Sequence, residues 1–477
     1  MNQAEFAKAI NQGLGRAIQH LQTHDATPYL AAIEYACLNN TAYDPQCEAT
    51  RDAYLFEIIQ LTGQSAYFLD RITRHLFLAE EYDDLAQLYR LTRMFVQIDF
   101  PETRKVLYER FDKFVTEKEM GGSDGSPWHR GMITKFSEEL IILDSLDAVL
   151  WITNRLGQEL NKQEDYYIDD SVLYEANEHF GKNEVANTLT DLAATNPNIS
   201  AYTKELQAQE QKRTSHQPNK TNRKRNFESY KEFKQKLLNY EGDIPPYIPI
   251  GWSNRVNWGN KQSANEDTAV FNEAATDLLQ TKEPRLLTAY LRIFWRNPFP
   301  LGCEPLFPFT KHDDEEVVEA ALDALAHFEH PTIRELAVTN LQRKEHIASA
   351  INMLTKNFHE GDFQLIADAL TAVASGDDWH DVGWVFHRGL MKSHLSPEAA
   401  DCLIMLYENT PCSNCRLEFI KFMNQTNTLP NWIIEEGCFD CDPEIRQFCK
   451  ELSIVQSEKN FTHHESRITN HESRVNL

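Results

Sequence analysis

Apolar side chains recur every three or four positions along most of the chain, and the strict alternation of a half-buried strand is nearly absent. In the segment 313–328 the apolar positions are Val317, Val318, Ala321, Leu322, Leu325 and Phe328. Two aspartates open this segment, where carboxylates suit the positive end of a helix, and the other charges lie opposite the apolar stripe. Pro331 then begins a second amphipathic helix. The pattern predicts an all-α fold.

The same pair of helices recurs with a step of 33 residues, because helices begin near Asp313, His346, Trp379 and Cys412. The predicted helices are 313–328 with 331–342, 346–357 with 362–374, 379–393 with 396–409, then 412–427, a short helix near 430 and one from about Pro443. One such pair cannot bury its apolar stripe alone, and stacking on its neighbours does so. The step therefore predicts an α-solenoid of stacked antiparallel helix pairs.

The remaining sequence divides around this array. Residues 1–206 predict a less regular N-terminal lobe, with helices over 2–22, 27–38, 49–61, 64–79, 83–99, 102–117 and 134–158. Residues 207–226 are polar and basic with almost no apolar groups, which predicts a disordered linker. A connector containing Pro and Trp follows at 227–264, and the repeat array covers 265–454. The tail, 455–477, holds the tandem copies HESRITN and HESRVNL and is also predicted to be disordered.

The segment DDEEVVEAALDALAHFEHPTIRELAVTNLQ resembles a HEAT-like repeat of the armadillo-type solenoids. ACLNNTAYDPQCEATRDAYLFEII and LYENTPCSNCRLEFIKFM are similar to parts of uncharacterised bacterial HEAT-repeat proteins. The resemblance runs from about residue 14 to 452, apart from the linker. It implies a curved scaffold for partner binding and transfers no catalytic residue, because HEAT patterns identify an architecture and not a reaction.

The chain is strongly acidic, with 72 Asp and Glu against 47 Lys and Arg and a formal net charge of −25. Such a surface repels phosphate backbones and anionic lipids, which disfavours nucleic-acid and membrane binding. Residues 303–453 carry 26 acidic and 11 basic side chains, so we expect a protein partner with a basic surface.

No apolar segment has the length of a membrane span or the form of a signal peptide, and nine cysteines suggest reduced thiols in the cytoplasm.

Two CxxC pairs are the sharpest candidate for chemistry: Cys412 with Cys415, and Cys438 with Cys441. Four thiolates at such spacing can hold a structural zinc ion with no open coordination position. Free cysteine is also a common small core residue, and a redox pair is a third interpretation. No other cofactor is expected from the sequence.

Trp252, Arg255 and Trp258 form an aromatic and arginine cluster in the least helical part of the sequence, 245–260. Residues of these types are enriched at interaction hot spots. The alternative is a connector whose tryptophans cover the end of a helical stack.

Asn39, Asn40 and Arg51 belong to a polar run around a turn between two predicted helices. The run is a candidate ligand pocket. The alternative is that its Asn and Asp side chains satisfy local backbone groups, while Arg51 pairs with Glu48 along a helix.

No sequence fingerprint of a serine hydrolase, zinc protease, P-loop or kinase occurs. We therefore expect a non-catalytic scaffold for protein–protein interaction, in which the second helix of each pair presents the binding face. Two other classes stay open. One is a HEAT-type nucleic-acid-binding or DNA-repair glycosylase-like enzyme, which needs a positive groove. The other is a binding module that contains structural zinc.

Overall fold

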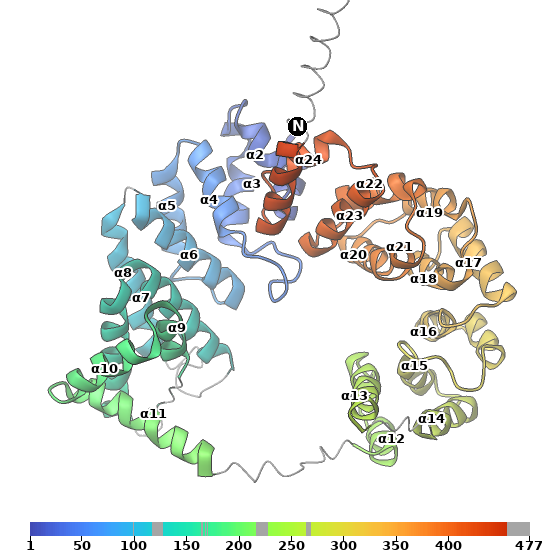
Figure 1. The fold of residues 1–477 in the computed structure, drawn as a ribbon, viewed down its shortest axis with the longest axis horizontal. Coiled ribbons are helices and arrows are strands. Elements are labelled where there is room, and N and C mark those ends of the chain that lie inside the picture. The colour runs from blue at the N-terminus through green and yellow to red at the C-terminus, as the bar shows by residue number, and fades with distance from the viewer. Residues whose placement is uncertain are drawn as a thin grey trace, which may run out of the picture. The chain divides into compact units, whose positions relative to one another are not determined.

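The computed structural model describes residues 1–98, 100–116, 127–163, 166, 168, 170–215, 228–263 and 269–455 (Figure 1). Within these ranges all regular structure is helical and no strand occurs, which confirms the predicted all-α class. Among the described helices, none combines the length and apolar character that crossing a membrane requires. The chain forms two compact units. Unit 1 comprises Met1–Lys220 and Asn431–Leu477, and unit 2 comprises Thr221–Pro430.

The first part of unit 1 consists of helices that follow one another closely in sequence. They are α1 (Gln3–Gln12), α2 (Arg16–Leu21), η1 (Thr27–Tyr29), α3 (Leu30–Leu38), α4 (Asp52–Leu61), α5 (Ser65–His75), α6 (Tyr82–Ile98), η2 (Pro101–Thr103), α7 (Arg104–Thr116), α8 (Pro127–Lys162), α9 (Ser171–Phe180), α10 (Lys182–Ala193) and α11 (Pro197–Ser215). The predicted helix 2–22 is two helices, because Gly13 adopts a left-handed conformation with φ of 73° that ends α1.

The second part of unit 1 is the C-terminal segment, which packs against α2 and α4 through α24 (Asn431–Gly437) and a helix over 443–455. Arg16 Nε lies 2.8 Å from Glu436 Oε1, and an Arg446 guanidinium nitrogen lies 2.9 Å from Glu57 Oε2. The Cys441 N–H donates a hydrogen bond to the Gly13 carbonyl over 2.8 Å. Sequence periodicity assigned this segment to the array 265–454, whereas its contacts group it with the N-terminal helices (Figure 1).

Unit 2 contains the helices of the 33-residue step. Its elements are α12 (Tyr230–Leu238), α13 (Tyr247–Ser263), α14 (Ala269–Gln280), α15 (Pro284–Ile293), η3 (Glu304–Lys311), α16 (Glu315–Leu325), α17 (Pro331–Arg343), α18 (Ile347–Asn357), α19 (Asp362–Leu370), α20 (Gly376–Val385), η4 (Phe386–Leu390), α21 (Met391–Ser393), η5 (Pro397–Ala399), α22 (Ala400–Asn409) and α23 (Ser413–Gln425). Asp314 caps α16 by accepting from the N–H groups of Glu316 and Val317. Helices two apart in this series, such as α16 and α18 or α17 and α19, contact each other.

Two predicted irregular segments contain helix. α11 continues to Ser215 and so covers the first part of the predicted linker 207–226, whose remaining residues lie outside the described ranges. α13 covers residues 247–260 of the stretch 245–260, which was predicted to be the least helical part of the sequence. Its Pro249 falls in the first turn, where a backbone N–H has no partner within the helix, so the proline removes no helical hydrogen bond. Residues 456–477 of the tail also lie outside the described ranges.

Candidate functional site

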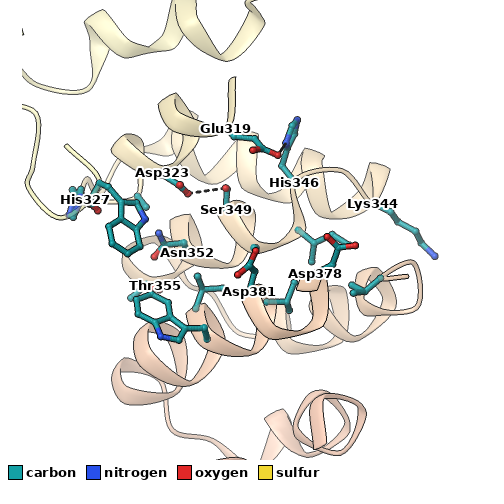
Figure 2. A pocket seen from close by; sticks show the side chains of 18 of the residues that line it. Glu319, Asp323, His327, Lys344, His346, Ser349, Asn352, Thr355, Asp378 and Asp381 are labelled. Carbon is teal, nitrogen blue, oxygen red and sulfur yellow. Dashed lines mark hydrogen bonds and ion pairs between the residues drawn. The ribbon is translucent and has the colours of Figure 1, made fainter. Parts of the chain in front are cut away.

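A cavity of about 940 Å³ lies within unit 2 and is bordered mainly by α16, α18 and α20 (Figure 2). These are the first helices of three successive predicted pairs, whereas the sequence had suggested that the second helices present the binding face. Lining positions recur at the 33-residue step, as in Glu315, Ala348 and Asp381. We call this cavity the α16–α18–α20 groove.

Carboxylates outnumber Lys and Arg around the groove. Its acidic lining residues are Glu315, Glu319, Asp323, Asp378 and Asp381, and its Lys and Arg residues are Arg296, Lys344 and Lys356. In Figure 2 the Asp381 carboxylate extends from α20 toward α18, on the side where Asp323 meets Ser349. The groove therefore concentrates negative charge from two helices, α16 and α20.

Asp323 is the most perturbed carboxyl group of the groove. Burial raises its pKa to about 6, and the nearby charge of Glu319 acts in the same direction. The Ser349 hydroxyl donates a hydrogen bond to Asp323 Oδ1 over 2.9 Å, which partly offsets this effect. No Lys or Arg in the described ranges forms an ion pair with Asp323. Burial likewise raises the pKa values of Glu319 and Asp381. The charge of these carboxylates is thus incompletely compensated by the protein.

Two tryptophans line the groove. The rings of Trp295 and Trp384 stack with their centroids 5.9 Å apart and their planes 19° from parallel. The Arg296 guanidinium lies 4.6 Å from the centre of the Trp295 ring. The ring Nε2 of His327 lies 3.0 Å from the Trp295 carbonyl oxygen, and burial lowers the pKa of this histidine. The site accordingly offers flat aromatic surface beside carboxylates.

His346 forms a small cluster with carboxylates at the rim. Its Nε2 lies 3.4 Å from Glu315 Oε1, and its Nδ1 lies 3.9 Å from Glu319 Oε1. These three side chains are close enough to share a cation, as are Cys303, Glu304 and His330 elsewhere in unit 2. Both groups include exposed carboxylates, and such carboxylates often cluster without a metal ion.

The first CxxC pair lies beside histidines of α20 and η4. Cys412 occupies the N-cap of α23 and Cys415 its first turn. Cys415 Sγ lies 3.8 Å from His380 Nδ1 and 3.8 Å from His387 Nε2. Hydrogen bonds from Cys415 and His380 lower the pKa of Cys412 below its ordinary value, and burial lowers the pKa of His387 to about 4. The structure thus places two thiols and two imidazoles together.

The second CxxC pair belongs to unit 1, where it follows α24. Cys438 is partly exposed and burial raises its pKa, whereas Cys441 is buried against Gly13. The predicted ligand set of four cysteines is therefore divided between the two units. The histidines beside the first pair, His380 and His387, were not part of the predicted ligand set.

The predicted aromatic cluster on α13 contains a core residue. Trp252 is 1% exposed, stacks on Phe233 with ring centroids 4.5 Å apart, and donates from Nε1 to the Glu228 carbonyl oxygen. Arg255 is half-exposed and lies 3.8 Å from a Glu228 carboxylate oxygen. The side chain of Trp258 lies outside the described part of the chain. Trp252 packs α13 onto α12, which agrees with the alternative of a tryptophan that covers other helices.

The polar run in unit 1 makes local structural contacts. Asn39 donates from Nδ2 to the Tyr35 carbonyl oxygen, and the Asn40 N–H donates to Asp84. Arg51 is buried, contacts the Asn11 carbonyl oxygen and Thr41, and pairs with Glu48 at 3.4 Å. These contacts favour the alternative that this run satisfies turn and backbone groups.

No protein-family model and no curated protein matches the chain. A solved structure of an engineered protein aligns with 13% sequence identity and a TM-score of 0.17 over 94% of this chain and 98% of the other. A TM-score this low supports no conclusion about fold or function.

Proposed function

We propose that unit 2 is a non-catalytic protein-interaction module, a solenoid of helix pairs whose α16–α18–α20 groove binds a basic side chain of a partner protein. The occupant would be an arginine or lysine in an extended or helical segment of that partner. Its cationic group would lie between Asp323 and Asp381, and its aliphatic part would contact the tryptophans.

The observation that carries this proposal is the incompletely compensated charge of the Asp323 carboxylate. A partly buried carboxylate without a cationic partner is costly, because burial removes water and leaves the charge poorly compensated. Its pKa of about 6 reflects that cost. A guanidinium from a partner would supply the missing charge and hydrogen bonds, and such charge-assisted bonds are stronger than neutral ones.

The tryptophans add a second reason. Trp295 and Trp384 line the groove, and the guanidinium groups of Arg296 and Arg388 lie 4.6 and 5.8 Å from the centres of these two rings. Tryptophan is enriched among residues that dominate binding energy, and its ring face attracts cations. The groove therefore combines the two features that suit an arginine side chain.

The charge of the groove argues against the nucleic-acid alternative. A phosphate backbone requires a continuous positive surface, whereas five carboxylates and three Lys and Arg residues line this cavity. The proposal accordingly keeps a basic protein segment as the ligand.

We expect the full chain to bind arginine-containing peptides on a synthetic array, with binding lost when citrulline, a neutral analogue, replaces arginine. Fluorescence anisotropy with the best labelled peptide then measures the affinity. The Asp323→Asn variant should bind about tenfold more weakly, because a charge-assisted contact is lost at constant side-chain size. Raising the salt concentration should also weaken binding.

Glu335→Gln is the matched control, since it makes the same chemical change at an exposed position of α17 outside the groove lining. This variant should bind the peptide as the unmodified chain does. Equal affinity of Asp323→Asn and the unmodified chain, or equal binding of the arginine and citrulline peptides, would contradict the proposal.

The titration of Asp323 predicts opposite effects of pH on binding and on stability. The folded-state pKa is raised from 3.8 to about 6, so the folded state binds this proton more tightly than the unfolded state. As the pH falls from 7.5 to 5, peptide affinity should decrease, while this group's contribution to the free energy of unfolding should increase by about 1–2 kcal/mol. Comparing pH series for the unmodified chain and Asp323→Asn isolates this group, and parallel series would contradict the assignment.

A further inference from the structure

Two thiols and one imidazole of unit 2 lie close enough together to share a metal ion. One ligand atom each from His380, Cys412 and Cys415 lies within 4.8 Å of the others. In a tetrahedral zinc site, bonds of about 2.3 Å to sulfur and 2.0–2.1 Å to nitrogen place neighbouring sulfur and nitrogen ligands about 3.5 Å apart. The separation of 3.8 Å between Cys415 Sγ and His380 Nδ1 is close to that value.

Local structure explains why these ligands converge. Cys412 has extended backbone angles at the N-cap of α23, and Cys415 follows three residues later, so both face the same side of the first turn. His380 lies on α20, which contacts α23. Cys412 and Cys415 are 4% and 2% exposed, so little solvent reaches their sulfur atoms.

A second histidine supplies an independent observation. His387 is 6% exposed, and its Nε2 faces Cys415 Sγ at 3.8 Å. Its other ring nitrogen, Nδ1, is buried and has no hydrogen-bond partner among the described residues. A buried polar atom without a partner requires an explanation, and a nearby bound ion or water molecule is one of those available. His387 also lies in a π-helical turn, η4, a distortion that is frequent at functional sites.

We propose that His380, Cys412 and Cys415 bind a thiophilic divalent cation, with Zn²⁺ as the best fit, and that His387 positions the Cys415 sulfur by donating a hydrogen bond to it. Two sulfur ligands and one imidazole favour zinc over calcium or magnesium, which prefer oxygen. The ion would connect α20 to α23. This ligand set differs from the four-cysteine site that the sequence suggested, because the second CxxC pair takes no part. The proposed metal site is also independent of peptide binding in the α16–α18–α20 groove.

The test uses the full chain, reduced and freed of metal by a chelator, with all nine cysteines confirmed as thiols. Titration with Co²⁺ should produce a sulfur-to-cobalt charge-transfer band and the strong visible bands of tetrahedral cobalt, saturating at one ion per chain. Zn²⁺ should then displace the cobalt and raise the melting temperature. The Cys412→Ser and Cys415→Ser variants should each lose about half of the charge-transfer intensity, because one of two thiolate ligands is removed.

The His380→Gln variant provides a test that leaves both cysteines in place, and its partial exposure makes misfolding a small concern. It should bind Co²⁺ on the order of 100-fold more weakly, with circular dichroism unchanged. The matched control is the double variant Cys438→Ser/Cys441→Ser, which should keep the complete cobalt spectrum. The proposal is wrong if no charge-transfer band appears, if the band survives loss of Cys412 and Cys415 together, or if the control variant removes it.

Discussion

The Gly15→Ala variant should lose about 3 kcal/mol of unfolding free energy in unit 1, because the added methyl group collides with backbone atoms. A Cβ at Gly15 would lie 1.9 Å from the Glu436 carbonyl oxygen and 2.9 Å from the Phe439 carbonyl carbon. Backbone atoms cannot move aside as a flexible side chain can. Gly15 has φ of −61°, which alanine also adopts, so the loss would come from the close approach alone. The C-terminal segment would have to withdraw from α2.

Guanidinium denaturation of the full chain measures the loss, and hydrogen exchange locates it. Exchange should accelerate in α2 and α24 and stay unchanged in unit 2. Gly376→Ala is the control, since its nearest neighbour would be Pro411 Cγ at 3.8 Å, an ordinary contact. This control should change stability by less than about 0.5 kcal/mol. A Gly15→Ala variant as stable as the control would show that the C-terminal segment does not pack on α2 as described.

The Arg334→Met variant should lose a similar amount of stability, about 3 kcal/mol, in unit 2. The guanidinium forms two hydrogen bonds with Asp362, of 2.7 and 2.9 Å, and a third with the Asn357 carbonyl oxygen. Asp362 is 4% exposed, so removal of its partner leaves a buried carboxylate without a cation. Methionine keeps the length and apolar contacts of the side chain, and the loss therefore reports the charge and its hydrogen bonds.

Arg343→Met is the matched control, because it makes the same substitution at an exposed position on the same helix, α17. It should shift the denaturation midpoint by an amount equivalent to less than about 0.5 kcal/mol. Hydrogen exchange of Arg334→Met should accelerate in α17 and α19, the helices that this network joins. Equal midpoints for the two variants would contradict the importance assigned to the network.

The helices of unit 2 could be predicted because their signals are local. An apolar stripe, Asp314 at the N-cap and Pro331 at the next helix start together specify α16 and α17. Such a stripe requires that one face be buried but does not specify against which helix. The segment 443–455 shows this limit, since its amphipathic pattern suits the array while its Arg446 pairs with Glu57 of α4. The close approaches at Gly13 and Gly15 and the ion pair of Arg16 with Glu436 join the C-terminal segment to the N-terminal helices.

The candidate sites were predictable to a smaller extent. The spacing of Cys412 and Cys415 identified one pair of thiols, but His380 lies 32 positions earlier and comes beside them only when successive helix pairs stack. The separation of His380 from Cys412 is close to the 33-residue step, so the step could have indicated that the two residues are neighbours. It could also have indicated the groove, where Glu315 and Asp381 are two steps apart. The burial of Trp252 could not be predicted, because composition does not distinguish a buried tryptophan from an exposed one.

Unit 1 is discontinuous, since unit 2 is inserted between Lys220 and Asn431. The partners Arg16 and Glu436 are 420 residues apart in the chain, so their contact closes a very long loop. During synthesis the first helices leave the ribosome well before the segment that covers them. All residues of unit 2 are synthesised before the C-terminal segment of unit 1, so unit 2 can fold before unit 1 is complete. The assembly of unit 1 is then the last step. A chain that ends at residue 430 would therefore contain the complete insert and an incomplete host.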